Sequence, residues 1–185
     1  MVNSSFEAGN LNLDPKGYSI IGQSTNGNTK VTNESIHSGT LALKINDDNC
    51  SKVPNGCQLG ISQSTTTTIN GRDYILSVWV RTPDSSKISS SKLRLGIFGV
   101  VPSTDPNYGS NIFNIYSQDR YQDFDLSSLR NNEWTRFEVS FSNVPLGKYP
   151  IIEIINYKGG TIYADDADLN EGQSYDQSTL VSQGS

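Results

Sequence analysis

The sequence predicts an all-β fold, a two-sheet antiparallel β-sandwich of the jelly-roll type. Short apolar runs recur along the 185 residues, and clusters of Gly, Ser, Thr and Asn separate them. No stretch of a dozen or more residues keeps the apolar spacing of an amphipathic helix, whereas several runs alternate with the period of two typical of strands. A chain of this length suits one domain with its own core and is short for two.

The positions of the strands follow from these runs. In FEVSF, Phe137, Val139 and Phe141 alternate with polar residues, which predicts a strand covered on one face only. YILSVWV and IIEII are apolar at nearly every position and are expected to be central strands packed on both faces. The expected strands, about eight or nine as in a jelly roll, lie near 5–7 and at 41–45, 58–62, 74–80, 93–98, 112–116, 137–141, 151–155 and 161–169.

The segments between the strands are polar. Those at 70–72, 83–91 and 142–147 carry turn residues and no helix-forming pattern. The longest irregular region, 102–133, holds several aromatic residues among polar ones, and long loops of this kind tend to bind something. Residues 1–169 are therefore expected to form the domain, and the polar residues 170–185 a linker or disordered tail.

The two cysteines lie close together in CSKVPNGC, where Pro, Asn and Gly favour a turn. This spacing predicts a disulfide between Cys50 and Cys57, with two unrelated thiols as the alternative. A disulfide indicates an oxidising environment, so we expect a secreted or cell-surface protein. Because strand-like residues begin almost at once, Met1 is interpreted as an added start on a fragment of a larger chain with other domains.

The charge of the chain limits its partners. Lys and Arg number 14 against 19 Asp and Glu, which gives a formal net charge of −5. The broad positive field of a nucleic-acid-binding or anionic-membrane-binding protein is missing. The longest apolar patch, GIFGVV, is far shorter than the roughly 20 residues that cross a bilayer, so no membrane insertion is expected.

Five segments together resemble carbohydrate-binding modules of the family 4, 9 and 22 type, which have a galactose-binding-domain-like jelly roll. They are NSSFEAGNL at the start, SIHSGTLALKI, ISQSTTTTINGRDYILSVWVR, NEWTRFEVSF and GGTIYADDADL. Their order and spacing match over nearly the whole chain up to Leu169. The resemblance implies a non-catalytic module, attached to a secreted polysaccharide-degrading enzyme or a surface protein, that binds a poly- or oligosaccharide.

The resemblance also bears on the tryptophans. Trp79 and Trp134 fall where the family places aromatic residues that pack on the sheets, so both are expected in the core. Related modules often carry an exposed aromatic residue after the strand containing Ala42 and Leu43. Here that segment is the disulfide loop and has no aromatic residue.

Catalysis finds little support in the residues. The single histidine, His37, precedes an apolar strand and is interpreted as a turn residue. With both cysteines paired, a Cys/His nucleophile or a zinc site cannot be assembled. Asp165 and Asp166 are neighbours in an expected strand, so their side chains should leave on opposite faces and cannot flank one glycosidic bond. The chain is therefore not expected to be an enzyme.

Sugar binding requires aromatic rings for the apolar faces of pyranoses and planar polar groups for the hydroxyls. The main ligand-binding candidates are Tyr108, Tyr116 and Tyr121 from the long loop and Gln63, Arg81, Arg94 and Glu153 from strands. Tyr18 is an outlying candidate.

The alternative to a sugar-binding module is a structural or adhesive domain of a surface or phage protein. The polar surface and the disulfide loop without an aromatic residue favour this alternative.

The acidic residues near the end of the domain have a different expected role. In the resembling modules, the Glu of the opening FE motif and the Asp of the closing DD motif hold a structural Ca²⁺. Here these residues are Glu7 and Asp165, with Asp166 as a substitute and a carbonyl near Ser38 as a further ligand. The alternative is that the two aspartates only solvate the end of a strand.

Overall fold

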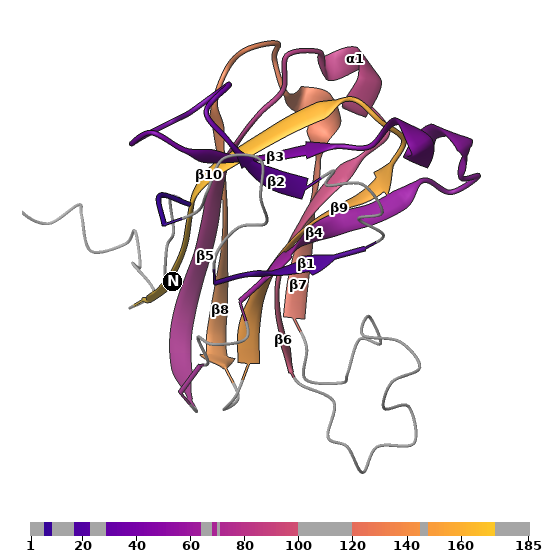
Figure 1. Ribbon diagram of the computed structural model, residues 1–185. Coiled ribbons are helices and arrows are strands. Elements are labelled where there is room, and N and C mark those ends of the chain that lie inside the picture. Colours follow the sequence, from indigo (N-terminus) through magenta and orange to yellow (C-terminus); the bar gives the residue numbers. More distant parts are fainter. Residues whose placement is uncertain are drawn as a thin grey trace, which may run out of the picture.

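The computed structural model describes residues 6–8, 17–22, 29–63, 68–69, 71–99, 120–144 and 148–172. Within these residues, two five-stranded sheets pack face to face (Figure 1). All strand pairs in both sheets are antiparallel. The predicted β-sandwich is confirmed.

Sheet I, as we name the first sheet, has the strand order β1-β4-β9-β6-β7. Its strands are β1 (Ser19–Ile21), β4 (Cys57–Ser62), β9 (Lys148–Tyr157), β6 (Lys92–Gly99) and β7 (Arg120–Asp125). Sheet II has the order β2-β3-β10-β5-β8. Its strands are β2 (Thr29–Thr32), β3 (Ala42–Asn46), β10 (Thr161–Glu171), β5 (Arg72–Arg81) and β8 (Thr135–Val144).

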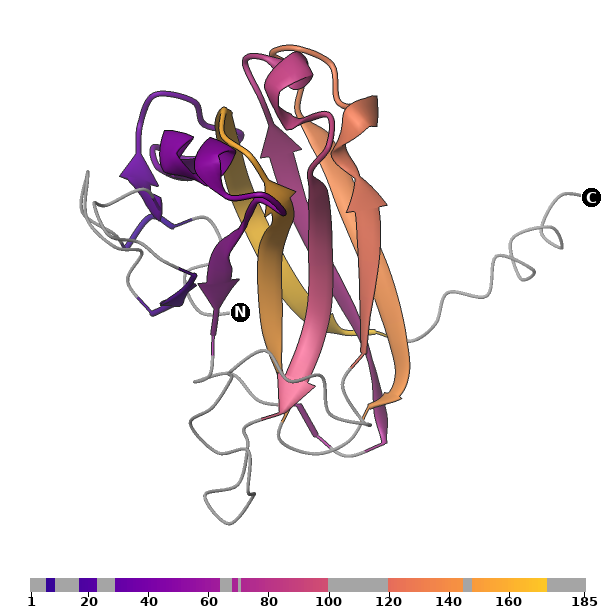
Figure 2. The ribbon, with the colours of Figure 1, turned by 90° about the vertical axis from the view of Figure 1, so that its right-hand side faces the viewer.

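In the described part of the chain, three short helices connect the strands: η1 (Asp48–Lys52), α1 (Ser85–Ile88) and η2 (Leu126–Ser128). Helix α1 lies in the segment expected to be free of helix, where the Asp84 side chain accepts the N–H of Ser86 and caps a single turn. Figure 2 shows α1 and η2 side by side at one end of the sandwich, where Leu126 donates its N–H to the Ser91 carbonyl at 3.2 Å.

The core lies between the two sheets. In β8, Phe137, Val139 and Phe141 are buried while Glu138 and Ser140 are exposed, as the alternation in FEVSF predicts. Burial of each large apolar side chain contributes about 1.5–3 kcal/mol. The fully buried part of the core includes Leu43, Leu59, Ile61, Leu76, Leu93, Leu95, Ile97 and Ile154.

Several strand predictions were wrong or incomplete. The segment near 5–7 is no strand in its described part, because Phe6 has a left-handed φ of 61° and its side chain is buried. Strands β1, β2 and β7 were missed because they are short or polar. The expected strand at 112–116 lies outside the described residues. Strand β10 continues to Glu171, two residues beyond the expected end of the domain at Leu169.

The predicted disulfide is confirmed. Cys50 in η1 and Cys57 at the start of β4 are bonded, with their Cα atoms 5.2 Å apart. Gly56, with a φ of 73°, makes the turn between them and donates its N–H to the Val53 carbonyl at 2.9 Å. Within the described residues, no helix has the length and apolar character needed to span a bilayer.

The disulfide should stabilise the fold measurably. We expect the double variant Cys50→Ala/Cys57→Ala to lose about 2.5 kcal/mol of unfolding free energy, because the bond closes a short loop in the unfolded chain. Urea unfolding of the variant and of the oxidised protein measures this difference. The reduced wild-type protein is the control and should unfold near the variant. Equal midpoints for all three samples would contradict the expectation.

Candidate functional site

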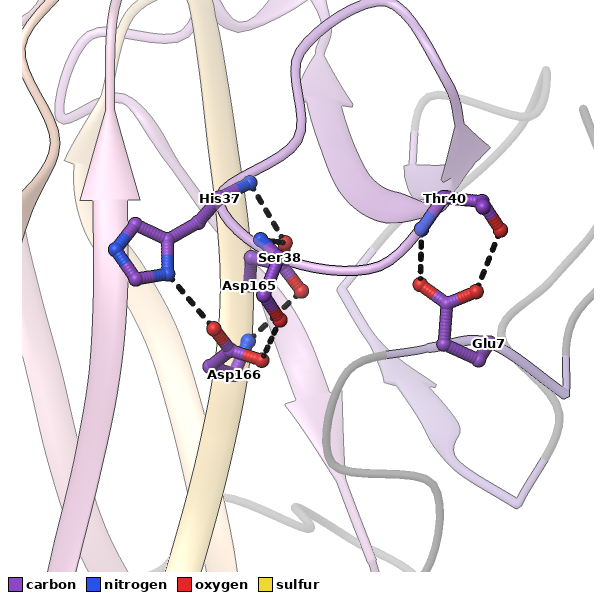
Figure 3. A network of polar contacts seen from close by, with 6 residues as sticks. All are labelled: Glu7, His37, Ser38, Thr40, Asp165 and Asp166. Atoms are coloured by element: carbon purple, nitrogen blue, oxygen red, sulfur yellow. Dashed lines mark hydrogen bonds and ion pairs between the residues drawn. The ribbon is translucent and has the colours of Figure 1, made fainter.

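The two aspartates of YADDADL lie at a bulge in β10, where pairing with β5 shifts between Asp165 and Asp168. Asp166 has a left-handed φ of 47° there. Figure 3 shows that both carboxylates approach the loop at His37 and Ser38. The expectation that they leave on opposite faces was wrong, because the bulge interrupts the alternation of a regular strand.

Asp165 is fully buried and anchors this loop. Its Oδ2 accepts the N–H of His37 at 2.9 Å and that of Ser38 at 3.1 Å, and its Oδ1 accepts the N–H of Asp166 at 2.8 Å. Burial raises the pKa of the Asp165 carboxyl, while the three N–H donors act in the opposite direction. Asp166 is more exposed and accepts from the Ser38 hydroxyl and pairs with His37 Nδ1, each at 2.7 Å.

Glu7 holds the same loop farther along (Figure 3). Its Oε1 accepts the N–H groups of Thr40 at 2.7 Å and Leu41 at 2.9 Å, and its Oε2 accepts the Thr40 hydroxyl at 2.6 Å. The Thr40 hydroxyl is the largest cause that lowers the pKa of Glu7. Residues distant in sequence are therefore tied together through one loop.

The expected calcium site requires that Glu7 and Asp165 have carboxylate oxygens with lone pairs not used in hydrogen bonds. Oε1 of Glu7 and Oδ2 of Asp165 each accept two N–H groups, whereas Oε2 of Glu7 and Oδ1 of Asp165 each accept one donor. A carboxylate oxygen has two lone pairs, so one oxygen of each residue keeps a lone pair for a cation. Among the described residues, no three His, Cys, Asp or Glu side chains form a group able to hold a metal ion. The calcium site stays a prediction.

The outer face of sheet II carries both tryptophans. Trp79 lies out of phase with the buried residues Val78 and Val80, and both Trp79 and Trp134 are only half-buried. The His37 ring stacks on Trp79 with centroids 4.1 Å apart and meets Trp134 edge-on at 5.5 Å. The expectation of two core tryptophans was wrong, because alternation along β5 turns Trp79 away from the core.

The outer face of sheet I brings polar residues together in one cross-strand row. Gly60, Glu153, Arg94 and Asp123 are successive partners across β4, β9, β6 and β7. Arg94 donates from Nε to Asp123 Oδ1 at 2.7 Å and from Nη2 to Oδ2 at 2.9 Å. The guanidinium also lies over the Tyr121 ring, 4.0 Å from its centroid. Arg94 is thus held in one orientation by an ion pair and a cation–π contact.

Glu153 is the most unusual residue of this row. It is 1% exposed, and its Oε2 accepts Gln58 Nε2 at 2.8 Å. Its Oε1 is buried and has no hydrogen-bond partner among the described residues. Burial is the main cause that raises the pKa of Glu153, while Gln58 and Arg94 act in the opposite direction. Buried carboxylate oxygens are costly without a donor, so this atom is poised to accept one.

An apolar patch adjoins the polar row. Ile21, Phe98 and Ile151 form a buried cluster, with Tyr149 packed against it. The Phe98 ring stacks with Tyr121 at a centroid distance of 6.4 Å, and Tyr121 is 40% exposed. A side chain at Gly96 would meet the Phe98 ring, since a Cβ there would lie 2.4 Å from it. Glycine at this position therefore lets Phe98 fold over the strand toward Tyr121.

The structure groups some of the predicted ligand-binding residues and separates others. Tyr121, Arg94 and Glu153 share the outer face of sheet I. Arg81 lies on sheet II, where its Nη atoms bond Ser35 and Asn132. Gln63 is fully buried beyond the end of β4.

Other candidates lie away from this face or outside the structure. Tyr18 is half-buried and packs on Phe6 with ring centroids 5.3 Å apart. Tyr108 and Tyr116 lie outside the described residues. Sequence reasoning missed Asp123 and Gln58, although the alternation in RYQDFD places Tyr121 and Asp123 on one face.

Neither a protein-family model nor a curated protein matches the sequence. Solved structures do. TmCBM61, solved in complex with β-1,4-galactotriose, is 17% identical to this chain, with a TM-score of 0.59. The alignment covers 93% of this chain and 97% of that chain. The CBM22-1 xylan-binding domain from Paenibacillus barcinonensis Xyn10C is 11% identical, with a TM-score of 0.54 and 90% of each chain covered.

A cyclase from Fischerella sp. TAU also shares the fold. It is 12% identical to this chain, with a TM-score of 0.56. The alignment covers 94% of this chain and 98% of that chain. At such identities, the likeness shows a common fold alone. The fold that the sequence resemblance implies is therefore confirmed, with carbohydrate-binding modules among the structural neighbours.

The anchoring role of Asp165 can be tested. We expect Asp165→Ala to lower the unfolding free energy by about 2–3 kcal/mol, since the N–H groups of His37 and Ser38 would lose their acceptor. Asp166→Asn, which tolerates the left-handed φ of 47° and removes the charge, is the matched control and should cost less than about 1 kcal/mol. Denaturant unfolding compares the variants. Similar losses for both would contradict the assignment of Asp165 as the main anchor.

Proposed function

We propose that this chain is a non-catalytic carbohydrate-binding module that binds a poly- or oligosaccharide on the outer face of sheet I. The observation that carries the proposal is the buried Oε1 of Glu153, to which no described residue donates and which lies beside the fixed Arg94–Asp123 pair. A sugar hydroxyl can donate to such an oxygen. Planar polar groups with fixed directions are what a saccharide site requires.

Tyr121 supplies the aromatic part of the proposed site. The residue is 40% exposed, and Arg94 and Phe98 lie against its ring. Aromatic rings offer the apolar face of a pyranose a large contact area at little cost in conformational entropy. The ring and the polar row are adjacent on the sheet, because Tyr121 and Asp123 are two residues apart in β7.

The structural neighbours support this class of ligand. TmCBM61 was solved with β-1,4-galactotriose, and the CBM22-1 domain is described as xylan-binding. The cyclase shows that the same fold also serves a protein named as an enzyme, so the non-catalytic part of the proposal requires its own test. In this chain, His37 is engaged with Asp166 and Trp79, and both cysteines are in the disulfide.

The setting of the module is part of the proposal. The disulfide favours an oxidising environment, so we place the protein outside the cell or at its surface. The fold is one that the neighbours use within larger chains, such as the tandem CBM22 domains of which this chain covers 42%. We therefore infer that the module is tethered to other domains.

Calorimetric titration tests the sugar-binding proposal. We expect one of a panel of plant, fungal and bacterial glycans to bind with a Kd of about 10 μM to 1 mM, since hydroxyls exchange water bonds for protein bonds with little net gain. Tyr121→Ala should weaken binding about tenfold, which corresponds to about 1.4 kcal/mol. Arg136→Ala, on the exposed outer face of sheet II, is the control and should leave the Kd unchanged.

Two results would overturn the proposal. Absence of heat with the whole panel would leave a structural or adhesive domain as the better description. Release of new reducing ends from a bound glycan would contradict the non-catalytic assignment.

We also propose a structural Ca²⁺ at the corner of Glu7 and Asp165. Oε2 of Glu7 and Oδ1 of Asp165 would contribute oxygens, with Asp166 and a carbonyl near Ser38 as further ligands of the roughly 6–8 that Ca²⁺ takes. The ion would bind the folded state only. It would offset the negative charge of these carboxylates and supply no chemistry.

The melting temperature tests the ion. At calcium about 100 times its dissociation constant, binding would add about 2.7 kcal/mol, so a chelator should lower the melting temperature by about 5–11 °C. Glu7→Ala should melt at or below the temperature of the chelated wild type, because the N–H groups of Thr40 and Leu41 also lose their acceptor, and it should not respond to the chelator. A wild-type melting curve that does not respond to chelator would rule the ion out.

A further inference from the structure

The charges on the proposed binding face do not balance. Arg94 places two N–H groups on Asp123, so these two opposite charges are paired with each other. Within the part of the chain that the structure describes, Glu153 receives a hydrogen bond only from the neutral Gln58 amide. When all three groups are ionised, the row Glu153, Arg94 and Asp123 carries one net negative charge.

Among the described residues, the strands beside Glu153 supply no second cation in contact with it. On one side β4 offers Gln58 and Gly60, and on the other β6 offers Arg94, beyond which lies Asp123 of β7. The next charged residue along β6, Lys92, is the cross-strand partner of Ile155 and faces Asp125 on β7. Along β9 itself, the outward neighbours of Glu153 are Ile151 and Ile155.

We propose that Glu153 makes the site selective for neutral glycans and against glycans that carry uronic acids. The inference rests on the proposed function and assigns the ligand class of that same face. Oε1 of Glu153 accepts a hydrogen bond that a hydroxyl group of a neutral sugar donates. A uronate brings a second carboxylate and no additional donor to the same buried region.

The discrimination follows from the low polarity of the site. Like charges a few Å apart repel strongly where water is excluded, and an unpaired like-charge contact disfavours the wrong partner. Arg94 cannot offset the repulsion fully, because its forked donors already hold Asp123. We therefore expect a neutral oligosaccharide to bind at least about tenfold more tightly than its acidic counterpart, or about 1.4 kcal/mol.

Calorimetry with matched ligand pairs tests this inference. The neutral probes are β-1,4-galactotriose, cellotriose and xylotriose. The acidic counterparts are galactotriose and cellotriose oxidised at C6 to uronates, and xylotriose that carries a glucuronic acid branch. Consider each pair in which at least one member binds the wild-type protein. For such a pair, Glu153→Gln should reduce the ratio of the two affinities to less than about threefold in favour of the neutral member, because the amide is uncharged.

A matched variant separates the local charge from the net charge of −5, which also repels acidic ligands. Glu138→Gln removes one carboxylate from the exposed outer face of sheet II. In this variant, the preference for neutral over acidic oligosaccharides should stay at its wild-type value. Added salt should also leave the wild-type preference largely unchanged, because screening acts on exposed and distant charges more than on a buried contact.

A measurement without substitution guards against a variant that fails to fold. Lowering the pH from about 7.5 to about 5 should strengthen uronate binding to the wild type, since burial raises the pKa of Glu153 while a uronate resembles an α-carboxyl with a pKa near 3.5. Equal affinity for neutral and acidic members at pH 7.5 would overturn the selectivity and leave sugar binding intact. Failure of every probe and every panel glycan to bind would instead overturn the proposed function and this inference with it.

Discussion

The register of the strands in sheet I is the constraint on which the candidate site depends. Ile154 and Leu93 face the core as cross-strand partners, and Glu153 and Arg94, one residue away, face outward as partners. A slip of one residue would send the charged pair into the core and expel the apolar pair. Because each large apolar side chain contributes about 1.5–3 kcal/mol on burial, the core between the sheets fixes the polar row outside it.

The two outer faces of the sandwich are used differently. On sheet II, the loop at 33–41 lies against the face and pairs with its polar groups, as Arg81 does with Ser35 and Lys44 with Glu34. The buried Asp165 and the turn residue Glu7 hold that loop by its N–H groups. Each sheet keeps one buried charged group with an unpartnered atom among the described residues, Oε1 of Glu153 on sheet I and Nε of Arg81 on sheet II. We propose the ligand on sheet I because there the unpartnered atom is an acceptor, which a hydroxyl can satisfy.

Much of the fold followed from the sequence because the core strands carry strong patterns. The alternation in FEVSF and the apolar runs of β5 and β9 predicted strands that the structure confirms. The edge strands β1 and β7 were missed because such strands need few apolar residues. The bulge at Asp165 could not be read, since neighbouring residues in a pattern of period two are assigned to opposite faces.

Three residues of the candidate site were chosen from the sequence, but their grouping could not be predicted from it. Arg94, Glu153 and Tyr121 were chosen for their side chains, but only the register puts them side by side and leaves Arg81 on the other sheet. Asp123 drew no attention in the sequence because its importance lies in orienting Arg94. The disulfide, by contrast, was readable because its two cysteines are close in sequence and joined by a turn.

The carboxylate of Glu153 is hard to explain as a purely structural feature. Its outward neighbours in β9 are isoleucines, and a third apolar residue would fit the surroundings without a buried charge. Because the folded-state pKa lies above the unfolded value, this carboxyl destabilises the fold as the pH rises through the folded-state pKa. Local sequence choices that work against stability tend to mark functional positions. A hydroxyl that donates to Oε1 would recover part of the loss, so ligand binding and stability are linked through this one oxygen.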